Sequence, residues 1–335
     1  MENKTLAIDF VLLGFSTNFT INLFLFVLFL LVYVTTVIGN SLIIHIIIIN
    51  PQLHTPMYFF ISKLSFIDLC NSSSAVPKML MDLLSTHRTI SLVACLIQVN
   101  ILLLMGTTEC LLLVLMAYDR CLAICLPLHY RVLMKWSMCH RLIALIWIFS
   151  LLLIILPSLL MPVTLCNPNQ INHFMCESLA VLHLSCHKNY SKEFAIFLLS
   201  FITILLPFTF IVISYVCIII SVLKIHSAGR VKAFSTCTSH LTVVAMYFGT
   251  GFLYSAHTVG AAIVLRLLLK GTCHLNLAGP VFGHMGGVFG CLIHPFLTRW
   301  LHAGRNLKAL VSMRRHTMSR NTVKYFRDIV RRLVR

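Results

Sequence analysis

The sequence contains few charged residues. Only 10% of its 335 residues are Asp, Glu, Lys or Arg, while 59% are hydrophobic. Soluble domains carry about 25% charged residues, so this composition excludes an ordinary soluble domain. The sequence also lacks a Gly-rich phosphate-binding loop and a plausible Ser/His/Asp arrangement, so nothing supports a soluble enzyme.

Long hydrophobic segments occupy most of the chain. A membrane-spanning helix needs about 20 apolar residues, and seven segments are long enough: 23–49, 58–81, 92–116, 141–162, 194–223, 236–257 and 275–298. The seventh is rich in glycine, which spanning helices tolerate because it permits close packing. We therefore predict an all-α membrane protein, with a seven-transmembrane helix bundle at 23–298, an N-terminal segment at 1–22 and a basic tail at 299–335.

Acidic residues are scarce as well, with 9 against 26 basic residues and a net charge of +17. The basic residues follow the third and fifth segments and are densest in the tail, which predicts an outer N-terminus and a cytoplasmic C-terminus. Nucleic-acid binding is the alternative explanation. Because the charge adjoins a membrane span, we expect the lipid bilayer as partner and no nucleic acid. The first segment is too long for a cleavable signal peptide and lacks a small-residue cleavage site.

Two acidic residues, Asp68 and Glu109, lie inside the predicted second and third spans. A carboxylate inside a membrane is costly and therefore a functional candidate. The pair suggests a shared cation or a shared proton, although each could instead be protonated and hydrogen-bonded. Buried acids also occur in proton-coupled transporters. Transporters usually contain internal repeats, and none is evident in this sequence.

Several of the 13 cysteines lie in the predicted spans, where they are expected to pack as small apolar residues. Four lie in segments assigned to the outside: Cys95, Cys166, Cys176 and Cys186. An oxidising exterior favours disulfides, and four cysteines allow three pairings. A metal ion could instead be bound by His173, Cys176, Glu177 and His183. An oxidised Cys176 cannot be a thiolate ligand, so we predict no metal site.

An adjacent acid and base, Asp119 and Arg120, close the third apolar segment. The pair could simply anchor a helix end at the interface. However, residues 116–130 read MAYDRCLAICLPLHY, residues 53–60 read LHTPMYFF and residues 232–241 read KAFSTCTSHL. Together these strings resemble those of vertebrate odorant receptors, a branch of the rhodopsin-like G-protein-coupled receptors.

The resemblance implies roles for several residues. Arg120 would meet the G protein on activation, Asp119 would restrain it, and Tyr215 would swing toward Arg120. The disulfides would be Cys95–Cys176 and Cys166–Cys186. Asp68 and Glu109 would bind a sodium ion that stabilises the resting state, and no other cofactor is expected.

The resemblance also implies a small hydrophobic odorant as ligand and an olfactory stimulatory G protein, acting through cyclic AMP, as partner. Such a pocket is largely apolar. We expect it to be lined from the third and sixth spans by Leu102, Met105, Gly106, Thr107, Phe248, Phe252 and Tyr254. Residues 246–250 read MYFGT, where the family has Phe before Tyr. Phe248 thus takes the place of a pocket tyrosine, and only Tyr247 or Tyr254 could restore its hydroxyl.

Beyond His257 the sequence departs from the family pattern. The family motif Asn-Pro-x-x-Tyr in the seventh helix is replaced by residues 294–298, read HPFLT, which keep only the proline. The alternatives are a divergent receptor with an altered switch, or an impaired product whose reading frame changed near residue 258. At the other end of the chain, Asn3 and Asn18 are candidate glycosylation acceptors.

Overall fold

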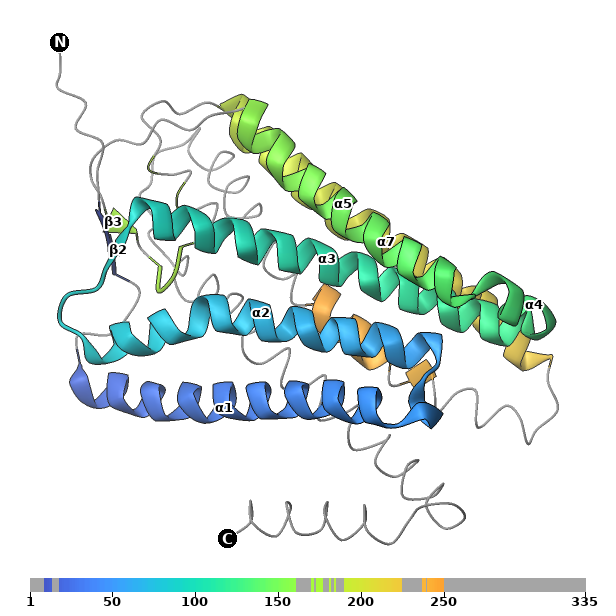
Figure 1. Cartoon of the computed structure of the whole chain (residues 1–335). Helices are drawn as coiled ribbons and strands as arrows, with labels where there is room; N and C mark the ends of the chain where they lie inside the picture. The colour runs from blue at the N-terminus through green and yellow to red at the C-terminus, as the bar shows by residue number, and fades with distance from the viewer. Residues whose placement is uncertain are drawn as a thin grey trace, which may run out of the picture.

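The computed structural model describes residues 9–13, 18–160, 170–171, 173–176, 181, 184, 190–224, 237–238 and 240–249, with side chains omitted at 157–160 and 190–202 (Figure 1). The expected seventh span, the basic tail, Asn3, Cys166, Cys186, Phe252 and Tyr254 lie outside these residues. Within them the chain is mostly helical, as predicted.

Long helices account for most of this part of the chain. They are α1 (Phe19–Ile49), α2 (Pro56–Leu84), α3 (Leu92–Cys125), α5 (Trp136–Leu160) and α7 (Tyr190–Leu223). Shorter elements are η1 (Pro51–Leu53), α4 (Pro127–Leu133) and the helical segment His240–Gly249. Four of the described helices are long and apolar enough to cross a membrane: α1, α3, α5 and α7. Charged residues interrupt the apolar sequence of α2, among them Lys63 and Asp68.

The helices extend beyond the apolar segments expected from the sequence. The predicted span 92–116 ends well before α3 does, so Asp119 and Arg120 lie within its last turns. The chain meets no helix breaker until Pro127, which opens α4. At the other end of the bundle, the Asn18 side chain accepts a hydrogen bond from the Thr20 backbone N–H, so α1 begins ahead of its apolar run.

The helices alternate in direction, so α1, α3 and α7 end where α2 and α5 begin (Figure 1). This end, which also carries α4, is called here the α4 end. Helix α3 packs against α2, α5 and α7, while α1 packs on α2. Central residues of α3 such as Leu112, Leu113 and Met116 are buried in the largest apolar core. Phe24 on α1 and Leu152 on α5 are exposed, as expected of lipid-facing surfaces.

A small sheet covers the opposite end of the bundle, called here the sheet end. It joins β1 (Asp9–Leu12), β2 (Thr89–Ser91) and β3 (Gln170–Ile171) in the order β2-β1-β3. Strand β1 is antiparallel to β2 and parallel to β3. Phe10 and Leu12 point inward and pack in a cluster with Ile90 and Ile171. The alternation of buried and outward residues fixes the register of this sheet.

Candidate functional site

The charge pair of α3 lies at the α4 end, where Asp119 has two partners. Its Oδ2 lies 3.4 Å from a terminal nitrogen of Arg120. The Tyr130 hydroxyl, from α4, donates a hydrogen bond of 2.7 Å to Oδ1. Burial raises the pKa of the Tyr130 phenol, and the Asp119 carboxylate raises it further, so the hydroxyl remains a donor. The sequence alone assigned no role to Tyr130, although it is the last residue of the 116–130 string.

Tyr215 of α7 lies at the same end of the bundle and contacts the helical segment His240–Gly249. Its hydroxyl is hydrogen-bonded to Nδ1 of His240 over 2.7 Å, and the two rings stack with centroids 5.8 Å apart. Both side chains are buried. His240 also went unassigned from the sequence, although it lies in the KAFSTCTSHL string. The pair therefore joins α7 to the helical segment His240–Gly249 near the charge pair.

Thiol groups bind the ends of α3 and α7 together. The Ser221 hydroxyl donates to the sulfur of Cys125 over 3.1 Å, and that thiol lies 3.6 Å from the backbone oxygen of Cys217. The sulfurs of Cys121 and Cys125 are 3.8 Å apart. These contacts hold α7 beside the Asp119–Arg120 pair.

The two intramembrane acids lie on neighbouring helices, Asp68 on α2 and Glu109 on α3, and both are buried. Each interacts electrostatically with the phenol of Tyr247. Their oxygen atoms are suitable ligands for a hard cation. In the described part of the chain, no three His, Cys, Asp or Glu side chains come together as a metal site.

The described residues expected to line a ligand pocket lie on α3 and in the helical segment His240–Gly249. On α3, Met105 is buried while Leu102, Gly106 and Thr107 are partly buried. Phe248 is buried and packs against Phe208, with ring centroids 5.4 Å apart.

The exchange of aromatic residues at positions 247 and 248 has a clear structural result. The Tyr247 hydroxyl donates a 2.7 Å hydrogen bond to the backbone oxygen of Gly106. This hydroxyl therefore links α3 to the helical segment His240–Gly249. A ligand would have to break that bond to use the Tyr247 hydroxyl as a donor.

At the sheet end, a disulfide joins Cys95 of α3 to Cys176, with Cα atoms 5.4 Å apart. Gln98 reinforces this connection, because its amide oxygen accepts from the Cys176 backbone N–H and its nitrogen donates to the Ser74 carbonyl, both at 3.0 Å. Cys176 is therefore oxidised and is not a thiolate ligand. His173, a candidate ligand, is hydrogen-bonded to the backbone of Met175.

The comparisons with known proteins agree with the resemblance seen in the sequence. A family model described as "Olfactory receptor" matches residues 29–275. Human olfactory receptor 2A5 is 42% identical over 255 residues, covering 75% of this chain and 82% of that protein. Human olfactory receptor 2A12 is 41% identical over 316 residues, covering 94% of this chain and 97% of that protein. Human olfactory receptor 6F1 is 44% identical over 266 residues, covering 78% and 86%.

These matches span most of the chain and most of each relative, so the predicted family is confirmed. The membrane-length helices fit the same assignment. The chain belongs to the olfactory receptor family of G-protein-coupled receptors, and it is a multi-pass plasma-membrane protein rather than an enzyme.

Proposed function

We propose that this chain is a seven-helix odorant receptor that binds a small hydrophobic odorant and activates the olfactory stimulatory G protein, which raises cyclic AMP. The observation that carries the proposal is the set of contacts at the α4 end. There Asp119 holds Arg120 and accepts from Tyr130, while Tyr215 pairs with His240. Helices α3, α4 and α7 and the segment His240–Gly249 are thus connected around one arginine.

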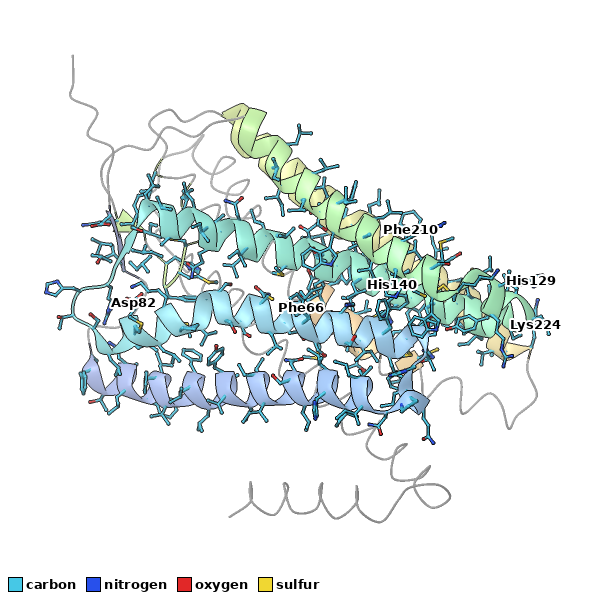
Figure 2. The ribbon with its side chains drawn as sticks, in the orientation of Figure 1. Phe66, Asp82, His129, His140, Phe210 and Lys224 are labelled. Atoms are coloured by element: carbon cyan, nitrogen blue, oxygen red, sulfur yellow. A yellow bond between two sulfur atoms is a disulfide. The ribbon has the colours of Figure 1, made fainter. Side chains whose placement is uncertain are left out.

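The α4 end is the cytoplasmic end in this proposal. Figure 2 labels His129 and Lys224 there, and the exposed residues Arg131, Lys135 and Arg141 lie at the same end. The sheet end carries acids as well as bases, including Asp9, Asp82 and Arg88. An excess of Lys and Arg on one side is typical of the cytoplasmic face, which places the N-terminus outside. Asn3 and Asn18 would then be available for glycosylation.

Activation is a population shift between two arrangements of the bundle. In the resting arrangement the Asp119–Arg120 pair and the Tyr247–Gly106 hydrogen bond hold α3 in place. An odorant between α3 and the helical segment His240–Gly249 would favour the arrangement in which that segment moves away and Arg120 is free. Asp68 and Glu109 would bind sodium in the resting arrangement, as two buried carboxylates on neighbouring helices that both interact electrostatically with Tyr247.

The alternative of an impaired product concerns residues 258–335, which lie outside the described structure. The family model covers this chain to residue 275, and the 2A12 match covers 94% of it. The alternative from a different class of protein is a transporter. Substrate uptake by cells that express the chain would distinguish a transporter from a receptor.

The test is cyclic AMP in cells that co-express the full chain and the olfactory G protein under an odorant panel, with surface staining of the same cells. The proposal expects a response that Arg120→Ala abolishes at equal surface display. Silence despite surface display would contradict it. Rescue of signalling by a family-like seventh helix would then identify residues 258–335 as the impaired part.

A further inference from the structure

An aromatic cluster joins α2 to α5 at the α4 end. Phe59 of α2 contacts Trp136 and His140 of α5 edge to face, with ring centroids 5.7 Å and 4.9 Å apart. Trp136 and His140 are one helical turn apart and therefore share a face of α5. Trp136 is 45% exposed, so this cluster lies at the surface of the bundle. We call Phe59, Trp136 and His140 the aromatic junction.

A lysine extends the aromatic junction along α2. The Lys63 ammonium lies 5.1 Å from the centre of the Phe59 ring, in the range of a cation–π contact. Phe59, Lys63 and Phe66 follow one another at helical spacing, so they form a stripe on one face of α2. Phe66, labelled in Figure 2, is half exposed. Lys63 lies about 10 Å along the helix from its start, a depth from which lysine can reach the headgroup level.

The cations around the aromatic junction are not neutralised by carboxylates of the described residues. The two ion pairs among the described residues join Lys78 to Asp82 and Arg120 to Asp119, and neither includes Lys63, Lys135 or Arg141. Lys135 and Arg141 are exposed and flank Trp136 and His140 in sequence. Together with Lys63, they leave a net positive charge beside exposed aromatic side chains.

We propose that the aromatic junction and its three cations bind an anionic phospholipid of the membrane. Lys63 and Arg141 hold the headgroup phosphate, Trp136 lies at the glycerol level, and Phe66 contacts the start of an acyl chain. Exposed aromatic surface next to the cations favours a ligand with an acyl chain over free phosphate. The inference rests on the proposed orientation, since anionic phospholipids are concentrated in the cytoplasmic leaflet.

Quenching of Trp136 fluorescence by brominated phospholipids tests the proposal directly. The sequence contains three tryptophans, so a Trp147→Phe, Trp300→Phe background leaves Trp136 as the only probe. The purified full chain is placed in nanodiscs that contain brominated phosphatidylserine or brominated phosphatidylcholine over the same series of mole fractions. Phosphatidylserine is expected to quench at lower mole fraction, and Lys63→Met and Arg141→Gln should each reduce this preference about fivefold. Lys224→Met, at the same end but directly after α7, is the matched control.

Equal quenching by the two lipids would overturn the proposal, as would an equal loss of preference in Lys224→Met. Displacement of the lipid by soluble glycerophosphoserine would show that the site binds a free headgroup, and it would overturn the proposal of a membrane phospholipid. If a variant of Lys63 or Arg141 does not fold, quenching in the chain with unaltered cations is measured at increasing salt concentration instead. Screening by salt weakens a headgroup contact but not an apolar contact. The nanodiscs are symmetric and contain no G protein, so failure here is distinguishable from failure of the proposed receptor function.

Discussion

The Tyr247 hydroxyl donates a hydrogen bond to the backbone oxygen of Gly106, 141 positions earlier in the chain. The bond crosses from the helical segment His240–Gly249 to α3, and its donor, the Tyr247 phenol, interacts electrostatically with two buried acids, Asp68 and Glu109. It depends on the exchanged order of Tyr247 and Phe248. The same exchange places Phe248 in an apolar contact with Phe208.

Tyr247→Phe removes this bond and keeps the ring. We expect basal cyclic AMP to rise, because one restraint between α3 and the moving segment is lost. Stability should fall by about 1 kcal/mol, the usual net value of one hydrogen bond. Basal signalling and thermal unfolding of the purified chain check both effects. The control is Tyr33→Phe, which removes a hydroxyl that is hydrogen-bonded between α1 and Ser73 of α2. Equal basal cyclic AMP in the unaltered receptor, Tyr247→Phe and Tyr33→Phe would contradict the role of Tyr247.

Asp119→Asn removes the charge that holds Arg120 but keeps an oxygen that can accept from Tyr130. We expect basal cyclic AMP to rise severalfold. Tyr130→Phe keeps the charge pair and loses only the hydroxyl contact, so its effect should be smaller. Cyclic AMP normalised to surface display ranks the two variants. A larger effect in Tyr130→Phe would show that the hydroxyl, rather than the charge, restrains the bundle.

Cys95→Ser opens the disulfide that anchors the segment at Cys176 to α3. Removing a native disulfide typically costs about 2–5 kcal/mol, so surface display should fall sharply. The double variant Cys95→Ser, Cys176→Ser should behave like the single one, because both lack the same bond. Cys70→Ser, at a free cysteine of α2, is the control. Additive losses in the double variant would mean that the two cysteines act separately.

Asp68→Asn tests the proposed sodium site. In the unaltered receptor, replacing sodium by N-methylglucamine should increase basal cyclic AMP, because the ion favours the resting arrangement. Asp68→Asn and Glu109→Gln should both abolish this sensitivity, and Asp9→Asn, in β1, should keep it. Retained sensitivity in Asp68→Asn would exclude that carboxylate as a ligand.

The helices were predictable because membrane-length apolar runs are local features of the sequence. The ends of the helices were less predictable. Polar residues such as Thr20 and Asn22 fall outside the apolar run but belong to α1. The three strands escaped prediction because each has at most four residues and its partners are distant in the sequence.

The site was predictable where one residue is unusual by itself. Asp119 and Arg120 are charged within an apolar segment, and Asp68 and Glu109 are acids within a membrane. Tyr130, His240 and Gln98 carry no such local signal. Their roles come from partners that only the fold brings near, such as Asp119 for Tyr130 and Tyr215 for His240.

The position of β1 in its sheet constrains the order of assembly. It is the central strand, yet it is synthesised before both of its neighbours. Strand β3 lies more than a hundred residues later, so one edge of β1 remains unpaired until that segment has been synthesised and has reached the sheet end. Long-range pairing of this kind forms late in folding. The sheet can therefore be complete only when the segments that contain β2 and β3 lie on the same side of the membrane as the N-terminal segment.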